Sequence, residues 1–167
     1  MSYHEIPNDS EFLRNLNPTS DLELIEIDFY KVTVDQHEGQ VICLFSSPDK
    51  ILGVELNSIE GTMLTFTASD CSENSHLRTI YHLYTETMQL CKFTLEKVII
   101  ESKRGDMLYG RLHWVDEKKR KILKVCSAGD AIVLAIMSNV KIYMVKSVYD
   151  EMDDYSEYDQ KLTDEYE

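Results

Sequence analysis

Two carboxylic acids occupy equivalent positions at the starts of two expected helices. Glu60 lies three residues after Asn57, and Asp130 lies three residues after Ser127. Asn and Ser are preferred helix N-caps, and an acid in the first turn stabilises a helix by about 0.3–1 kcal/mol. Capping is therefore the ordinary role of each acid. If the two acids converge, they can also bind Mg²⁺ or Mn²⁺ and support phosphodiester hydrolysis.

A histidine is a further candidate for acid–base chemistry. His76 lies near the start of a helix expected over 76–90, where apolar residues recur at helical spacing. The five histidines of the chain show no metal-binding spacing. A polar surface position is the ordinary alternative for His76.

Basic side chains are candidates for contact with a phosphate backbone. They lie on an expected strand over 107–115, in the hairpin turn that follows it and at the start of the next expected strand over 120–126. The candidate nucleic-acid-binding residues are Arg111, His113, Lys119, Arg120 and Lys121. The alternatives are a solvated sheet face for the first two, which share a face by parity, and edge protection for the last three.

The net charge of −13 is distributed unevenly along the chain. Residues 1–30 carry −6 and residues 147–167 carry −8, whereas residues 31–146 carry +1. A body that is close to neutral does not exclude nucleic acid as a partner. The acidic end offers a second possibility, namely binding of a basic protein.

The length predicts a single domain with two tails. We expect a loosely packed segment over 1–21, a folded domain over 22–150 and a solvated acidic tail over 151–167. No apolar run is long enough to span a membrane, and no signal peptide is recognised. Four cysteines without a CxxC pair are typical of reduced thiols, so we expect a cytoplasmic protein.

The expected elements alternate between strands and helices. Strands are predicted over 29–34, 41–45, 51–56, 92–101, 107–115, 120–126 and 141–145, and helices from 57, over 76–90, over 127–137 and over 146–152. This order predicts an α+β fold, with a mixed, mostly antiparallel sheet or sheets and two or three packed helices. Lys50-Ile-Leu-Gly-Val and Lys121-Ile-Leu-Lys-Val each lead into a capped helix, which suggests a duplicated strand–helix unit.

The segment Val125-Cys-Ser-Ala-Gly-Asp-Ala-Ile-Val-Leu-Ala135 resembles the bifunctional nuclease (BFN) domain family. That family has Asp-x-Arg-Pro-Ser-Asp-Ala-Ile-Ala-Leu-Ala at this place, and its Leu-Pro-Ile-x-Ile-Gly-x-x-Glu-Ala is similar to the stretch from Leu52 to Gly61. The resemblance extends over roughly 29–150 and implies nuclease action on RNA and DNA. Glu60 and Asp130 are the acids of the pattern that remain. Val125 and Ser127 replace the family's aspartate and arginine, and Ser75-His76-Leu77 stands for Thr-His-Asp.

Two functional hypotheses follow. The first is a nuclease that can use a divalent metal such as Mg²⁺ or Mn²⁺. Its catalytic candidates are Glu60, His76 and Asp130, of which Glu60 and Asp130 are the candidate metal ligands. The second is an inactive binding or regulatory module that keeps the fold. We also expect self-association through the strand at 92–101, whose apolar outer face suggests an edge that a second copy could cover.

Overall fold

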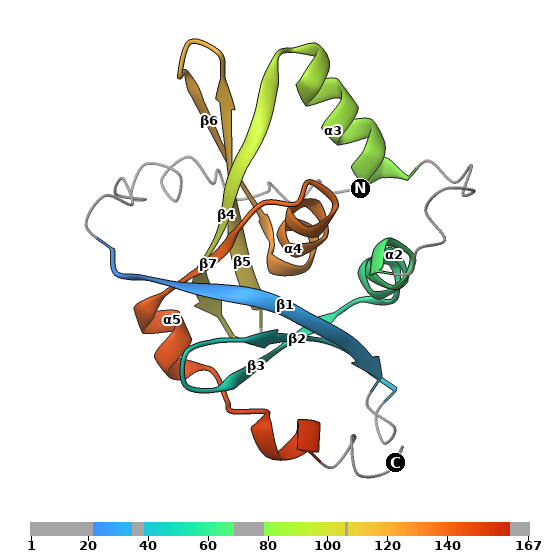
Figure 1. The fold of residues 1–167 in the computed structure, drawn as a ribbon, viewed down its shortest axis with the longest axis vertical. Helices are drawn as coiled ribbons and strands as arrows, with labels where there is room; N and C mark the ends of the chain where they lie inside the picture. Colours follow the sequence, from blue (N-terminus) through green and yellow to red (C-terminus); the bar gives the residue numbers. More distant parts are fainter. Residues whose placement is uncertain (1–21, 35–38, 69–78, 106, 161–167) are drawn as a thin grey trace, which may run out of the picture.

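The computed structural model describes residues 22–34, 39–68, 79–105 and 107–160 (Figure 1). In chain order the elements are β1 (Leu24–Val34), β2 (Val41–Ser46), β3 (Ile51–Leu56), α2 (Ser58–Ala68), α3 (Ile80–Leu90), β4 (Phe93–Arg104), β5 (Met107–Asp116), β6 (Lys121–Ser127), α4 (Ala128–Met137), β7 (Ile142–Val145) and α5 (Lys146–Glu151). A further short helical stretch covers residues 156–160.

The described strands form one mixed sheet in the order β3-β2-β1-β7-β4-β5-β6. Every neighbouring pair is antiparallel except β4 and β7, which are parallel. The predicted α+β class with a mixed, mostly antiparallel sheet is confirmed. Because β4 lies between β7 and β5, it has no free edge, so the reason given for self-association through this strand was wrong.

The topology repeats once along the chain. The strands β1, β2 and β3 form an antiparallel meander that leads into α2, and β4, β5 and β6 form a second meander that leads into α4. The edge strands of the sheet are thus the two strands that feed helices. This arrangement agrees with the predicted duplication of a strand–helix unit, and β7 fills the gap between the two halves.

The helix α4 lies at the centre of the molecule, with α2 and α3 beside it (Figure 1). Seven of its ten residues are buried, as expected for a helix that is apolar on almost all sides. Its close approach to β5 requires a glycine, because a Cβ at Gly110 would lie 2.6 Å from that of Ala131. The buried residues of α4 join those of β4 and β5 in one core.

The segment 151–160 is packed against the sheet, so the predicted solvated tail is wrong for these residues. The amide of Tyr155 donates to the carbonyl of Ile51 on the edge strand β3 at 2.8 Å. Farther along, Asp159 pairs with Lys31 of β1 at 2.5 Å. Unpaired backbone groups of an edge strand and a neutralising lysine together hold the acidic segment, which the sign of its charge alone did not reveal. Residues 161–167 lie outside the described part of the chain.

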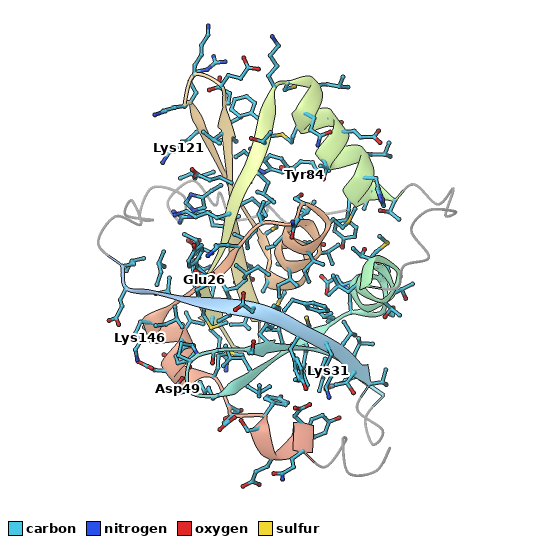
Figure 2. All side chains as sticks on the ribbon, in the orientation of Figure 1. Glu26, Lys31, Asp49, Tyr84, Lys121 and Lys146 are labelled. Carbon is cyan, nitrogen blue, oxygen red and sulfur yellow. The ribbon has the colours of Figure 1, made fainter. Side chains whose placement is uncertain are left out.

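Figure 2 shows how charged side chains gather at the surface while the sheet and α4 enclose the apolar ones. Among the helices that the structure describes, none combines the length and apolar character that crossing a bilayer requires.

Candidate functional site

The two strand–helix corners of the repeated topology meet at the carboxylate of Glu60. One oxygen of this carboxylate accepts a hydrogen bond from the Asn57 amide at 2.9 Å, and the other accepts one from the Ser127 hydroxyl at 3.3 Å. The side-chain oxygen of Asn57 in turn accepts from the amides of Ile59 and Glu60. The capping arrangement predicted for the first helix is therefore present, and its acid also reaches the second corner.

Ser127 caps the second helix and connects it to the first. Its hydroxyl oxygen accepts from the Asp130 amide at 3.0 Å, which is the N-cap contact predicted from the sequence. The carboxylate of Asp130 has a different partner, because its Oδ1 accepts from the hydroxyl of Tyr81 at 2.7 Å. A continuous chain of hydrogen bonds thus joins α3, α4 and α2 around Ser127.

A glycine makes room for the Glu60 carboxylate at the first turn of α4. A Cβ built on Gly129 would lie between 2.2 and 2.4 Å from the three carboxylate atoms of Glu60. The carboxylate therefore lies against the N-terminus of α4 as well as that of its own helix, where the helix dipoles favour negative charge. The position that a phosphate takes at a helix N-terminus is consequently filled by a protein side chain.

The surroundings of Glu60 change its proton affinity. Burial raises the pKa of Glu60 above the usual range of a glutamate, because only 5% of the residue is exposed. The Asn57 amide opposes this by lowering the pKa, the charge of Asp130 raises it further, and the Ser127 hydroxyl lowers it. The charge of Asp130 thus acts on the Glu60 carboxylate, and interacting carboxylates of this kind are suited to proton transfer.

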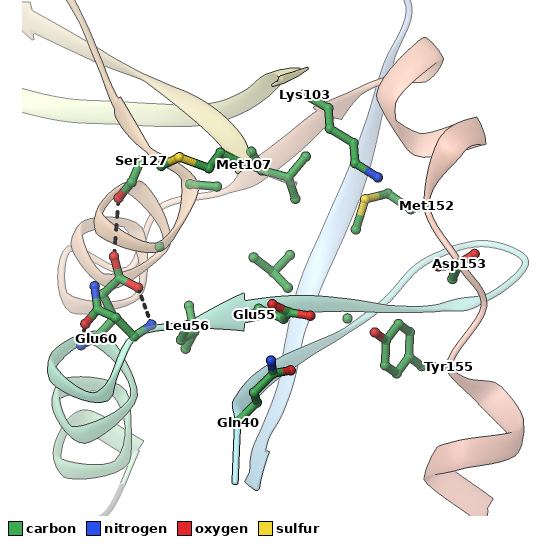
Figure 3. Close-up of a pocket in the computed structure, with 16 residues that line it drawn as sticks. Gln40, Glu55, Leu56, Glu60, Lys103, Met107, Ser127, Met152, Asp153 and Tyr155 are labelled. Carbon is green, nitrogen blue, oxygen red and sulfur yellow. Dashed lines mark hydrogen bonds between the residues drawn. The ribbon is translucent and has the colours of Figure 1, made fainter. Parts of the chain in front are cut away.

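A cleft of about 670 Å³ opens at this junction (Figure 3). The polar side chains Asn57, Glu60 and Ser127 lie at its inner end, and the first residues of α4 belong to the same wall. The rest of the lining comes from β3, from the connected ends of β4 and β5, and from the segment after α5. The labelled residues of Figure 3 include Gln40, Glu55, Lys103, Met107, Met152, Asp153 and Tyr155.

The predicted hairpin cations lie far from this cleft. Met107, at the start of β5, lines the cleft, whereas Lys119, Arg120 and Lys121 follow the other end of the strand. A ten-residue strand spans roughly 30 Å, so the cluster does not share a site with Glu60. Arg120 also has a structural partner, because its Nε donates to Asp116 at 2.6 Å within the turn.

Arg111 and His113 are buried, which is incompatible with the predicted contact to a phosphate backbone. They are 3% and 5% exposed, and the Arg111 guanidinium is paired with Glu101 through contacts of 2.8 and 3.1 Å. Burial, together with the nearby positive charges of Lys97, Arg111 and Lys121, lowers the pKa of His113 to about 4. Parity placed the two residues on one face correctly, but it did not show that both faces of β5 are covered here.

The third catalytic candidate, His76, lies outside the described residues. The sequence indicated Ser127 only as a cap, and Tyr81 lies in the helix expected over 76–90 without any sign of its polar partner. The serine between two acids was visible as a capping signal, but the contact from Tyr81 to Asp130 spans 49 positions and had no local signal.

A divalent ion needs several oxygen, nitrogen or sulfur ligands. In the part of the chain that the structure describes, no group of three or more His, Cys, Asp or Glu side chains is arranged to hold a metal. The pair Glu60 and Asp130 fits Mg²⁺ only if phosphate oxygens of a substrate and water complete the coordination, which is common for this ion.

Residues 43–156 match the bifunctional nuclease domain family. The match covers more than half of the chain and includes both corners, α4 and every residue of the cleft lining except Gln40. The chain therefore belongs to the bifunctional nuclease domain family, in agreement with the resemblance seen in the sequence. No curated protein is significantly similar to the chain.

Proposed function

We propose that this protein is a nuclease that hydrolyses phosphodiester bonds of RNA or DNA at the junction of Glu60, Ser127 and Asp130. The observation that carries this proposal is the junction of the two corners at a cleft, where the Ser127 hydroxyl donates to the Glu60 carboxylate and accepts from the Asp130 amide, within the region that matches the family. The two acids are 70 positions apart in the sequence, and the hydrogen bond from Ser127 to Glu60 that joins their corners supports a shared role.

The chemistry assigned to Glu60 is that of a general base. In its ionised form it takes the proton of a water molecule whose oxygen attacks phosphorus, while the bond from phosphorus to the bridging oxygen breaks. The leaving oxygen takes a proton from solvent. A carboxylate whose pKa is raised by burial accepts this proton more readily than an ordinary glutamate does.

Asp130 and Ser127 position this base. Asp130 supplies a second negative charge beside Glu60, and the Ser127 hydroxyl fixes one oxygen of its carboxylate. A bound Mg²⁺ or Mn²⁺ would be held by Glu60 and Asp130 together with substrate phosphate, and it would neutralise charge and acidify water.

A binding or regulatory module without catalysis is the second candidate. It is favoured by the fact that both oxygens of Glu60 and one oxygen of Asp130 already accept hydrogen bonds within the protein. Such an arrangement also describes acids that serve only to fix the helices.

The two functions are separated by a cleavage assay with labelled single-stranded RNA and DNA in Mg²⁺, in Mn²⁺ and in EDTA. We expect cleavage by the native protein and a loss of at least about tenfold in the Glu60→Gln and Asp130→Asn variants. Undiminished cleavage by the double variant would remove the site assignment. An intact native protein that cleaves neither substrate in any buffer would favour the binding module.

A further inference from the structure

Beyond the acids of the junction, the size and the walls of the cleft also indicate what it can bind. Its volume of about 670 Å³ lies in the range of sites that enclose small organic ligands, so it can hold a short single strand but not a duplex. Its walls come from segments distant in sequence, including β3, the β4–β5 connection and the residues that follow α5. Substrate binding by these outer walls rests on the proposed nuclease function.

A phosphate in the cleft needs a positive partner outside the junction. The N-terminus of α4 cannot serve, because the carboxylate of Glu60 lies directly against Gly129. Among the described residues that line the cleft, Lys103 alone carries a positive charge. It is exposed near the end of β4, and its ammonium group projects into the space between the walls (Figure 3).

The opposite wall presents an aromatic ring in a fixed position. The ring of Tyr155 lies so close to Gly53 that a Cβ there would be 2.7 Å from two ring atoms. Its backbone is fixed by the bond to the Ile51 carbonyl, and the ring also meets Tyr158 edge to face at 6.0 Å between centroids. A held aromatic ring in a cleft wall is suited to stacking against a nucleobase of any type.

We infer that the cleft binds single-stranded nucleic acid, with Lys103 on a backbone phosphate and Tyr155 against a base. The strand then leads toward Glu60 and Ser127 at the inner end. Two exposed acids of the lining, Glu55 and Asp153, repel phosphate. Binding is therefore weak in EDTA and stronger in Mg²⁺, which offsets this repulsion.

The inference is tested by fluorescence anisotropy with a labelled uridine hexanucleotide and the full-length protein. Affinity is measured in Mg²⁺ at salt concentrations from about 50 to about 200 mM. Lys103→Met should lower the slope of log affinity against log salt by about 0.7. Tyr155→Leu should weaken binding about tenfold, whereas Tyr155→Phe keeps the ring and should bind normally. Lys141→Ala, at an exposed lysine outside the cleft lining, is the charge-matched control.

The inference is overturned if the native protein does not bind the oligonucleotide, or if Lys103→Met and Tyr155→Leu bind it normally. Loss of binding only in a Lys119→Ala, Lys121→Ala variant would place the strand on the β5–β6 hairpin instead. Binding of an oligolysine peptide in place of RNA would identify the cleft as a site for basic protein segments.

Failure of this inference is distinguishable from failure of the nuclease proposal. If Lys103→Met and Tyr155→Leu both bind normally and still cleave, the nuclease proposal stands and the roles given to Lys103 and Tyr155 are wrong. If the native protein binds the oligonucleotide through Lys103 and Tyr155 but does not cleave it, the binding inference stands and the nuclease proposal is wrong. Circular dichroism spectra and melting curves of each variant exclude loss of the fold as the cause.

Discussion

Glu60 lies between two helix N-termini, and the first turn of α4 accommodates it because residue 129 is glycine. A carboxylate in this place links the two corners through Asn57 and Ser127. The same side chain can stabilise the junction and transfer a proton, since the first role fixes the geometry that the second needs.

Substitution of Gly129 by alanine should destabilise the protein. The new methyl group would overlap the Glu60 carboxylate, and overpacking of this kind costs about 1–3 kcal/mol. Urea unfolding at equilibrium measures the loss. In a Glu60→Ala background the loss should largely disappear, whereas an equal loss in both backgrounds would assign the effect to another contact.

Stability should rise with pH through the titration of His113. Its pKa lies near 4 in the folded protein and near 6.5 when it is unperturbed, so the unfolded chain binds the proton more tightly. The free energy of unfolding therefore falls as the pH drops through 6.5 toward 4, by up to roughly 2–3 kcal/mol. Denaturant titrations from pH 7 to pH 4 measure this, and His113→Gln should have the shallower dependence.

At the scale of elements, the segment after α5 acts as a cover for the edge of β3. The Ile51 amide donates to the side-chain carboxylate of Asp154, and the Ile51 carbonyl accepts from the Tyr155 amide. The ammonium of Lys50 binds the carbonyls of Tyr149 and Met152 at 2.8 and 2.6 Å. The edge is thereby protected from pairing with other chains.

Replacement of Gly53 by valine should release this cover. The side chain would occupy the place of the Tyr155 ring, and a cost of about 1–2 kcal/mol corresponds to a fall of several degrees in Tm. Limited proteolysis should then cut within 153–160 faster than in the native protein. If Gly53→Val adds nothing to the effect of Tyr155→Ala, the ring contact is the cause; a full additional loss would contradict it.

Elements and caps were predictable because their signals are local. Asn57 with Glu60, and Ser127 with Asp130, lie within four residues of each other, and the strands carry their own hydrophobic pattern. The burial of Arg111 depends on its pairing with Glu101 across the β4–β5 hairpin, and the docking of Tyr155 depends on a bond to Ile51, which is 104 positions away. The charge of the two segments alone predicted that both are exposed to solvent. Pairing of the guanidinium and binding to an edge strand remove them from solvent instead.

At the scale of the whole molecule, the junction lies where the two halves of the repeated topology face each other. Each half contributes one corner, so neither half contains the pair of acids by itself. The residues that match the family and the residues that line the cleft both come from the two halves together. The proposed activity is therefore a property of the assembled domain.

The strand β7 lies in the middle of the sheet although it is the last of the described strands in chain order. A nascent chain on the ribosome can form both meanders early, but β1 and β4 each keep one open side until residues 142–145 emerge. A chain that ends before this point exposes two unpaired strand edges, which can aggregate with other chains. Premature termination should thus yield aggregates or degradation products instead of a partly working protein.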